Sequence, residues 1–586
     1  MRIAVVLEDK CRSDRCGYEC IQYCPRVRTG DETVVKTEDG IKISEELCAG
    51  CGICVDKCPF DAIKIINLPE ELDKDKIHQF GENSFRLYRL PVPQKGMVIG
   101  LLGGNGIGKT TAIRILSGEI IPNMGRYEEE ASWDAVLDRY SGTGLGDYFK
   151  SLSEEGIKTS LKPQYVDKIP AHYSGKVEDL LSAVGDDYMR WVEILGIKNT
   201  LDSTLDKLSG GELQRVAIAA ASTKDADVYF YDEPSSYLDM KQRLSVAKAI
   251  RQKSKDNQVM VIEHDLAVLD FLADNVHILY GDKGAYGVVA QPRGVRKAIN
   301  TYLNGFLDEE NVRFRNTAIK FEDHVPTGEW HSRPLIRYDE LVKKWDGFEL
   351  KTEPGEIPEG EVIGIVGPNA TGKTTFVKML AEVIEPTEGE IEKQITVSYK
   401  PQYIKPNFEG RVMDLYHTEI SDSFNTSVFR SQVVSPLDLE ELYEREISNL
   451  SGGELQRVVI GLCLGRDADL YLIDEPSAYL DSSRRMDAAK TIRRFMEKSS
   501  KAGMIVDHDV YFIDYVSDLI MNFSGEPGFY GKGEGPYNMR EGMNNFLRDI
   551  KITFRRDPDT NRPRVNKLDS RLDKKQKSED EYYYTS

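Results

Sequence analysis

The sequence predicts a multidomain α/β protein in which two copies of one nucleotide-binding unit follow a small, cysteine-rich α+β domain. Eight of the nine cysteines lie within the first 58 residues. A glycine-rich phosphate loop, an octapeptide and an acidic pair then occur twice, in the same relative positions. A chain of 586 residues is long enough for roughly three or four domains, each with its own core.

The cysteines form two runs, each followed by a proline. The second run has the C-x2-C-x2-C-x3-C-P spacing of two-cluster bacterial ferredoxins, and the first is a wider version of it. In those ferredoxins the fourth cysteine of each run binds the other cluster. We therefore expect one 4Fe-4S cluster on Cys11, Cys16, Cys20 and Cys58, and the other on Cys24, Cys48, Cys51 and Cys54. Structural zinc sites and disulfides are the alternatives, although zinc sites usually have longer spacers between their cysteine pairs.

The phosphate-loop motif G-x4-G-K-S/T stands between an apolar run and a helical pattern in both copies. Its glycines let backbone N–H groups approach phosphates at a helix N-terminus, the lysine neutralises the outer phosphates, and the threonine binds Mg²⁺. The expected nucleotide-binding residues are Gly103, Gly104, Asn105, Gly106, Ile107, Gly108, Lys109, Thr110 and Thr111, and then Gly367, Pro368, Asn369, Ala370, Thr371, Gly372, Lys373, Thr374 and Thr375.

Each copy also contains an apolar strand that ends in an acidic pair. The pairs are Asp232 with Glu233, and Asp474 with Glu475. We expect the aspartate to hold Mg²⁺ through water and the glutamate to polarise the attacking water. Each aspartate lies 23 positions beyond the serine of a repeated octapeptide, LSGGELQR, from Ser209 to Asp232 and from Ser451 to Asp474. Identical spacing indicates one duplicated unit.

The octapeptide LSGGELQR, at 208–215 and again at 450–457, resembles the signature of the ATP-binding-cassette superfamily. The resemblance implies that the signature residues of each cassette serve the nucleotide on the opposite one; they are Ser209, Gly210, Gly211, Ser451, Gly452 and Gly453. It further implies that the glutamines of two PQY strings sense Mg²⁺ and nucleotide, that two histidines contact the γ-phosphate, and that two aspartates connect the cassettes. These residues are Gln164 and Gln402, His264 and His508, and Asp239 and Asp481.

The expected roles can be grouped by chemistry. The expected magnesium ligands are Thr110, Gln164 and Asp232 in the first cassette and Thr374, Gln402 and Asp474 in the second. The expected catalytic residues are Glu233 and His264, and Glu475 and His508.

The two cassettes differ by an insertion. The phosphate-loop lysine and the PQY glutamine are 55 positions apart in the first (109 to 164) and 29 in the second (373 to 402), a difference of 26. We expect the insertion at about 132–156, as two amphipathic helices around a glycine-rich connector. Exposed aromatic and charged residues would make it a docking device, and a plain surface elaboration is the alternative.

A second repeat follows each cassette. Residues 304–315 align with 544–555, and Phe306, Leu307, Phe314 and Arg315 are all matched. This recurrence predicts paired hinges. The expected boundaries are 1–76 for the iron-sulfur domain, 77–293 for the first cassette, 294–331 for hinge 1, 332–535 for the second cassette, 536–564 for hinge 2, and 565–586 for a charged, disordered tail.

Charge and hydropathy limit the functional classes. A net charge of −20 argues against broad adhesion to nucleic acid, although residues 548–577 carry eleven Lys or Arg against five Asp or Glu. No run approaches the roughly 18 apolar residues that would span a bilayer. The N-terminus also lacks the pattern of a signal peptide. We therefore expect a cytoplasmic protein without a membrane partner.

The whole arrangement resembles the RNase L inhibitor family, ABC subfamily E, over about residues 2–564. The resemblance implies a twin-cassette ATPase with two 4Fe-4S clusters, two ATP and two Mg²⁺, whose ATP-dependent closure moves the iron-sulfur domain and splits ribosomes after termination or stalling. It implies as partners the large and small ribosomal subunits (rRNA and ribosomal proteins), a release factor or its stalled-ribosome paralogue, and initiation factors on the small subunit. It also implies a monomer whose cassettes pair within the chain, and the short N-terminus is more typical of archaeal members.

Two other functions account for part of the sequence. An ATP-coupled iron-sulfur electron-transfer enzyme would explain the clusters but would leave the insertion and hinges without a role. A transporter motor would explain the twin cassettes, but not the cysteine domain.

Overall fold

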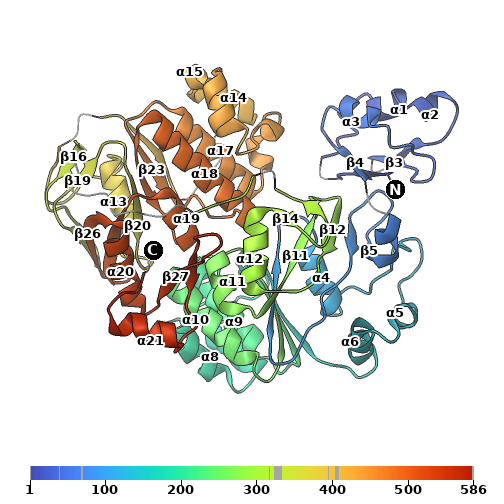
Figure 1. Ribbon diagram of the computed structural model, residues 1–586, viewed down its shortest axis with the longest axis horizontal. Helices are drawn as coiled ribbons and strands as arrows, with labels where there is room; N and C mark the ends of the chain where they lie inside the picture. Colours follow the sequence, from blue (N-terminus) through green and yellow to red (C-terminus); the bar gives the residue numbers. More distant parts are fainter. Residues whose placement is uncertain are drawn as a thin grey trace. The chain divides into compact units, whose positions relative to one another are not determined.

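The computed structural model describes residues 2–8, 10–37, 40–67, 70–315, 317–321, 333–392, 395–402 and 408–583. The chain forms two compact units. The first contains Met1–Pro234, Lys248–His264 and Leu272–Thr317, and the second contains Ser235–Ala247, Asp265–Phe271 and Ala318–Ser586. Figure 1 shows their elements. Positions 316 and 322–331 of the expected hinge 1 lie outside the described residues.

The cysteine-rich domain is a small α+β structure in the first unit. Strand β1 (Arg2–Val6) pairs with β4 (Ile63–Asn67), and β2 (Val34–Thr37) pairs with β3 (Gly40–Ile43), both antiparallel. Three short helices, α1 (Glu19–Gln22), α2 (Pro25–Arg28) and α3 (Ile53–Lys57), carry or flank the cysteines. The apolar core contains few residues, and three of its buried members are themselves cysteines: Cys20, Cys24 and Cys54.

The first cassette is built on a nine-stranded sheet of order β5-β6-β12-β11-β7-β10-β9-β8, with β13 beside β11. The strands are β5 (Lys76–Gln79), β6 (Arg86–Tyr88), β7 (Val98–Leu102), β8 (Thr159–Lys162), β9 (Val228–Asp232), β10 (Gln258–Ile262), β11 (Asn275–Asp282), β12 (Tyr286–Val289) and β13 (Arg293–Gly294). Strands β8, β9, β10, β7 and β11 run parallel. Every residue of β7 and β9 is buried, which explains their continuous apolar sequences.

The second cassette repeats this order in an eight-stranded sheet, β17-β18-β26-β25-β20-β24-β23-β22. The strands are β17 (Val342–Trp345), β18 (Phe348–Thr352), β20 (Val362–Val366), β22 (Val397–Lys400), β23 (Leu470–Asp474), β24 (Ala502–Val506), β25 (Leu519–Glu526) and β26 (Tyr530–Asn538). A smaller sheet contains β16 (Pro334–Tyr338), β19 (Gly355–Pro358) and β21 (Ile391–Glu392). The predicted fold class is confirmed.

Helices lie between the strands along the chain. In the first cassette they are α4 (Lys109–Leu116), α7 (Val177–Val184), α8 (Tyr188–Leu195), α9 (Gly210–Thr223), α10 (Met240–Lys253), α11 (Leu266–Leu272) and α12 (Val295–Asn304). In the second they are α13 (Lys373–Leu380), α14 (Val412–Glu419), α15 (Ser421–Phe424), α16 (Ser427–Phe429), α17 (Gly452–Gly465), α18 (Ser482–Ser499), α19 (Val510–Val516) and α20 (Met539–Ile550). Within the described ranges, no helix has the length and apolarity needed to cross a bilayer.

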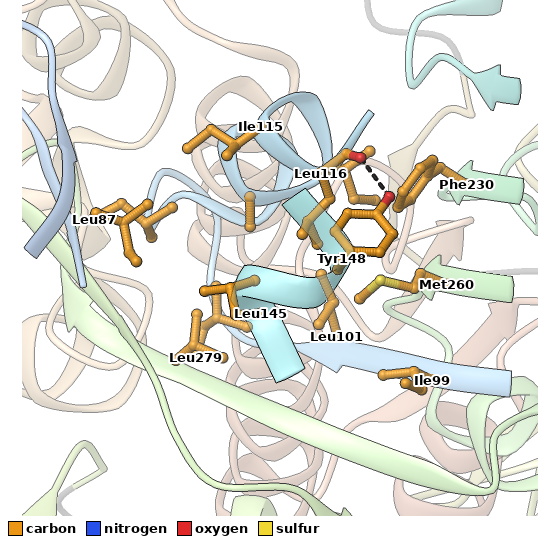
Figure 2. Packing of buried hydrophobic residues seen from close by; sticks show 14 of the residues in the cluster. Leu87, Ile99, Leu101, Ile115, Leu116, Leu145, Tyr148, Phe230, Met260 and Leu279 are labelled. Atoms are coloured by element: carbon orange, nitrogen blue, oxygen red, sulfur yellow. Dashed lines mark hydrogen bonds between the residues drawn. The ribbon is translucent and has the colours of Figure 1, made fainter. Parts of the chain in front are cut away.

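The expected insertion forms helices α5 (Trp133–Tyr140) and α6 (Gly144–Ser153), which lie side by side (Figure 1). Its aromatic residues are not exposed, contrary to expectation. Phe149 is fully buried, and the rings of Trp133 and Tyr140 lie 5.8 and 5.9 Å from it. The Tyr148 hydroxyl donates to the carbonyl of Leu116, 2.6 Å away (Figure 2). The apolar faces of the two helices therefore extend the cassette core.

The predicted hinge alignment is displaced by four residues. The helices α12 and α20 begin after Gly294 and Asn538, so Leu303 and Leu547 are both the ninth residue of their helix, 244 positions apart. The sequence alignment had used a separation of 240. Helix α12 ends because Gly305 has a φ of +75°, and a Cβ there would lie 2.3 Å from the Cβ of Arg315. Strand β14 (Phe306–Leu307) follows, paired with β15 (Val312–Arg313).

The C-terminal residues also differ from expectation, because 565–583 are ordered. Strand β27 (Phe554–Arg556) pairs with β28 (Pro563–Val565), and α21 (Arg571–Ser578) follows. Tyr583 is fully buried and its hydroxyl donates to Asp514 of α19. An aromatic anchor thus holds a polar segment whose composition is typical of disorder; residues 584–586 lie outside the described part.

Candidate functional site

Both phosphate loops end at the first residue of a helix. Lys109 begins α4 and its Nζ donates to the carbonyls of Gly103 (2.8 Å) and Gly104 (2.6 Å). Lys373 begins α13 and donates likewise to the carbonyls of Gly367 (3.0 Å) and Pro368 (2.6 Å). Each lysine therefore lies across its own loop, where an anion bound by the loop would contact it.

Two of the three expected magnesium ligands, the threonine and the aspartate, are in contact in each cassette. The Thr110 hydroxyl donates to Asp232 Oδ2 (2.9 Å), and the Thr374 hydroxyl donates to Asp474 Oδ2 (2.8 Å). Burial raises the pKa of both aspartates to about 6. Strands β7 and β9 lie on either side of β10, so the loop and the acid meet at the carboxyl edge of the sheet.

The glutamate of each acidic pair contacts the glutamine that the resemblance assigned to sensing and lies close to the histidine that it assigned to the γ-phosphate. Gln164 Nε2 donates to Glu233 Oε1 (2.7 Å), and His264 Nε2 lies 3.4 Å from the same oxygen. In the second cassette Gln402 Nε2 lies 2.7 Å and His508 Nε2 3.5 Å from Glu475 Oε1. Burial tends to raise the pKa of Glu475, but the bonds from His508 and Gln402 outweigh it and hold the pKa at about 2. This glutamate is therefore ionised at neutral pH.

The signature serines cap the helices that follow them. Ser209 precedes α9 and forms a capping box with Glu212, and Ser451 precedes α17 and forms one with Glu454. The signature glycines occupy the first turn of each helix, namely Gly210, Gly211, Gly452 and Gly453. A helix begun by two glycines presents its N–H groups without side chains in front of them, which suits an anion.

The two aspartates assigned to cassette communication have different partners within the second unit. The backbone N–H of Asn369, in the second phosphate loop, donates to Asp239 Oδ2 (3.1 Å). Asp481 caps α18 by accepting from the N–H of Arg484 (2.9 Å).

Sequence reasoning missed two pairs of residues that donate hydrogen bonds to the backbone of the acidic pairs. Gln214 and Gln456, in the signature helices, donate to the carbonyls of Glu233 and Glu475, each at 2.7 Å. Buried Lys162 and Lys400 donate to the same two segments. The available signal was the repeat itself, because both lysines stand in the string KPQY, at 162–165 and 400–403.

The N-terminal cysteines lie near one another in the structure. Cys11, Cys16, Cys20 and Cys58 line one cavity, together with apolar Ile41, Ala62 and Ile63. Burial raises the pKa of the Cys54 thiol to about 11, and its other acidic neighbours are Cys48, Cys51 and Cys24.

The residues present fit iron-sulfur clusters. All eight cysteines are unbridged thiols. Burial also raises the pKa of Cys20 to about 12, so a thiolate there needs a positive partner, which iron would supply. Among the residues described, no three Cys, His, Asp or Glu side chains converge on one point as around a single metal ion.

Comparisons with known proteins cover the same regions. A family model described as "ABC transporter" matches residues 93–236 and 350–478. A model described as "Possible Fer4-like domain in RNase L inhibitor, RLI" matches 1–32, and one described as "4Fe-4S binding domain" matches 41–64. ATP with Mg²⁺ and 4Fe-4S clusters are therefore the ligands that these domains imply.

Relatives match the entire chain. The protein is 45% identical to translation initiation factor RLI1 of Saccharomyces cerevisiae over 100% of this chain and 98% of the relative. A structure titled "Model of ribosome-bound archaeal Pelota and ABCE1" matches with a TM-score of 0.92 at 51% identity, over 100% of this chain and 99% of the other. The archaeal ribosome recycling factor aABCE1, solved with ribosomal stalk protein aP1, matches with a TM-score of 0.85 at 52% identity, over 88% and 100%. This chain therefore belongs to the RNase L inhibitor family of twin-cassette, iron-sulfur ATPases.

Proposed function

We propose that this protein uses ATP to split ribosomes into subunits after termination or stalling. The observation that carries the proposal is the match, over the whole chain, to the ABCE1 of the ribosome-bound complex with archaeal Pelota. The match to an archaeal ribosome recycling factor bound to a stalk protein supports it. The partners in this proposal are the large and small subunits, a release factor or Pelota-like paralogue, and initiation factors on the released small subunit.

The proposal assigns the same chemistry to both cassettes. Lys109 and Lys373 neutralise the outer phosphates, while the threonine, glutamine and aspartate of each site hold one Mg²⁺, which would stabilise charge on the transferred phosphoryl group. Glu233 and Glu475 accept a hydrogen bond from the attacking water. His264 and His508 orient these two glutamates and contact the γ-phosphate. Direct contacts from histidine and glutamine to each glutamate support these roles.

The stoichiometry and motion are also proposed. Two ATP bind, each between the phosphate loop of one cassette and the signature helix of the other, and closure of a monomeric chain in the cytoplasm moves the iron-sulfur domain. Two 4Fe-4S clusters would supply iron–thiolate bonds that cross-link separate segments of this domain. Its small apolar core, partly made of cysteine, supports that structural role.

The test is a splitting assay with iron-loaded protein, ribosomes, a release factor and ATP, followed by sucrose-gradient sedimentation. ATP-dependent release of subunits is expected, and the Glu233→Gln, Glu475→Gln double variant should bind ATP but turn it over at least about 100-fold more slowly. The exposed Glu129→Gln substitution serves as the control. Intact ribosomes with no co-sedimenting protein would contradict recycling, and reduction of an acceptor during ATP hydrolysis would favour electron transfer.

A further inference from the structure

The backbone of each catalytic glutamate is held by a buried lysine that lies outside the known motifs. Lys162 is the last residue of β8, and its side chain is completely buried. Its Nζ donates to the carbonyl of Asp232 (2.8 Å) and to that of Glu233 (3.2 Å). An ammonium group has three donors and can satisfy both carbonyls at once.

The glutamate that receives these bonds has an unusual backbone. Glu233 has a φ of +49°, in the left-handed region that side-chain-bearing residues rarely adopt. Its carbonyl also accepts from Gln214 Nε2 at 2.7 Å, so two side chains from different elements donate to one peptide oxygen. Backbone strain persists only where the surroundings hold it, and these two donors do so here.

The second cassette repeats the arrangement with its own residues. Lys400, also completely buried, donates to the carbonyls of Asp474 (2.7 Å) and Glu475 (3.5 Å). Glu475 has a φ of +48°, and Gln456 Nε2 donates to its carbonyl at 2.7 Å. Burying an ammonium group costs free energy unless it is hydrogen-bonded, and both lysines use their donors on these backbone carbonyls. A residue that served only for packing would not need that charge.

The lysines also connect the glutamate to the segment that detects nucleotide. Lys162 precedes Gln164 by two residues, and Gln164 donates to the carboxylate of Glu233 while Lys162 donates to its carbonyl. The KPQY segment therefore holds both ends of the glutamate, and a shift of that segment would move its carboxylate relative to the phosphate loop.

We propose that Lys162 and Lys400 are positioning residues for ATP hydrolysis, which hold the backbone of Glu233 and Glu475 in the left-handed conformation that aims each carboxylate at the attacking water. This inference rests on the proposed catalytic role of the two glutamates. The lysines act through the glutamates and do not touch the nucleotide.

The experiment compares four forms of the full, iron-loaded protein: wild type, Lys162→Met with Lys400→Met, Glu233→Gln with Glu475→Gln, and the quadruple variant. Methionine has a similar length and removes the donors. We expect the lysine variant to retain its KM for ATP within about threefold and to lose about 10–100-fold in kcat, which is less than or equal to the loss in the glutamine variant. In the quadruple variant the lysine changes should cost nothing further, since the group that they position is already absent.

Each outcome separates the possibilities. A lysine variant with unchanged kcat, beside a glutamine variant that has lost turnover, overturns the positioning role and leaves the proposed function intact. Unchanged turnover in the glutamine variant contradicts the catalytic assignment itself. Multiplicative losses in the quadruple variant would show that the lysines act independently of the glutamates, which also overturns the inference.

Stability is controlled in parallel. Lys158→Met removes an exposed lysine whose Nζ pairs with Asp225 (2.8 Å), and it should leave kcat and the melting temperature unchanged. If the buried substitutions prevent folding, Gln214→Leu with Gln456→Leu removes the second side-chain donor to the same two carbonyls. The same fall in kcat at constant KM is expected, and no fall would overturn the inference.

Discussion

Asn83 is expected to decide whether the iron-sulfur domain stays docked on the first cassette. It is buried, and its side chain bridges two strands of the iron-sulfur domain. Its Oδ1 accepts from the N–H of Ile43 (2.7 Å), and its Nδ2 donates to the carbonyls of Ile43 (2.8 Å) and Ala4 (3.1 Å). Its own carbonyl accepts from the N–H of Val6 (3.0 Å).

The substitution Asn83→Ala would remove the three side-chain bonds. Each is worth about 1 kcal/mol, so the docked state should lose about 3 kcal/mol, or roughly a factor of 100 in the equilibrium for local opening. Alanine would also occupy the left-handed backbone of this position, where φ is +58°, less readily than asparagine does. The estimate is therefore a lower bound.

Native-state amide hydrogen exchange measures this opening directly. The amides of Val6 and Ile43 should exchange about 100-fold faster in Asn83→Ala than in the wild type. The matched control is Asn123→Ala, because Asn123 also makes three side-chain bonds, to Gln79 (3.0 and 2.7 Å) and Gly125 (3.1 Å), but all within the cassette. Acceleration of less than threefold at Val6 and Ile43, or equal acceleration by the control, would refute the reasoning.

Further predictions concern the clusters, pH and a buried ion pair. Cys24→Ser and Cys58→Ser should each lower the iron and sulfide content by one cluster and leave different electron paramagnetic resonance signals; loss of the same signal in both would break the crossed ligand sets. Burial and the adjacent Asp518 raise the pKa of Glu361 to about 7, so its contribution to stability is present at low pH and is lost as pH rises through 7. Glu361→Gln should therefore raise the melting temperature more at pH 8 than at pH 5, and an equal rise would contradict this. Asp270 is fully buried and pairs with two arginines, so Asp270→Ala should cost about 3–5 kcal/mol in urea unfolding, whereas Glu129→Ala at an exposed pair should cost under about 1 kcal/mol.

The chemistry could be predicted from the sequence because its groups lie in short, contiguous strings. A phosphate loop needs backbone N–H groups, a lysine and a threonine within nine residues, and local spacing reveals them. The duplication strengthened each assignment, since Asp232 and Asp474 occur at the same distance from their signatures. The structure brings Gln164 and His264, which the resemblance assigned to the same nucleotide site, close to Glu233.

Positions that depend on distant segments could not be predicted in this way. The hinge alignment failed by four residues because the helices α12 and α20 begin 244 positions apart, whereas the aligned strings are 240 positions apart. Gly305 also ends α12 before Phe306, whereas Phe546 lies inside α20. The C-terminal segment has the composition of a disordered tail. In the structure Tyr583 of this segment is buried and donates to Asp514, which fixes the segment in place.

The sequence alone thus determined the fold class, the two sets of nucleotide-site residues and the cysteine runs, since each is encoded by neighbours in the chain. Only the tertiary structure identified Asn83 and the lysines of KPQY as bridging residues. Their partners lie about 40 to 80 residues away, from 83 to 43 and 4 and from 162 to 233. A side chain's burial and its hydrogen-bond partners are properties of the packed chain, and the spacing of residues in a sequence does not contain them.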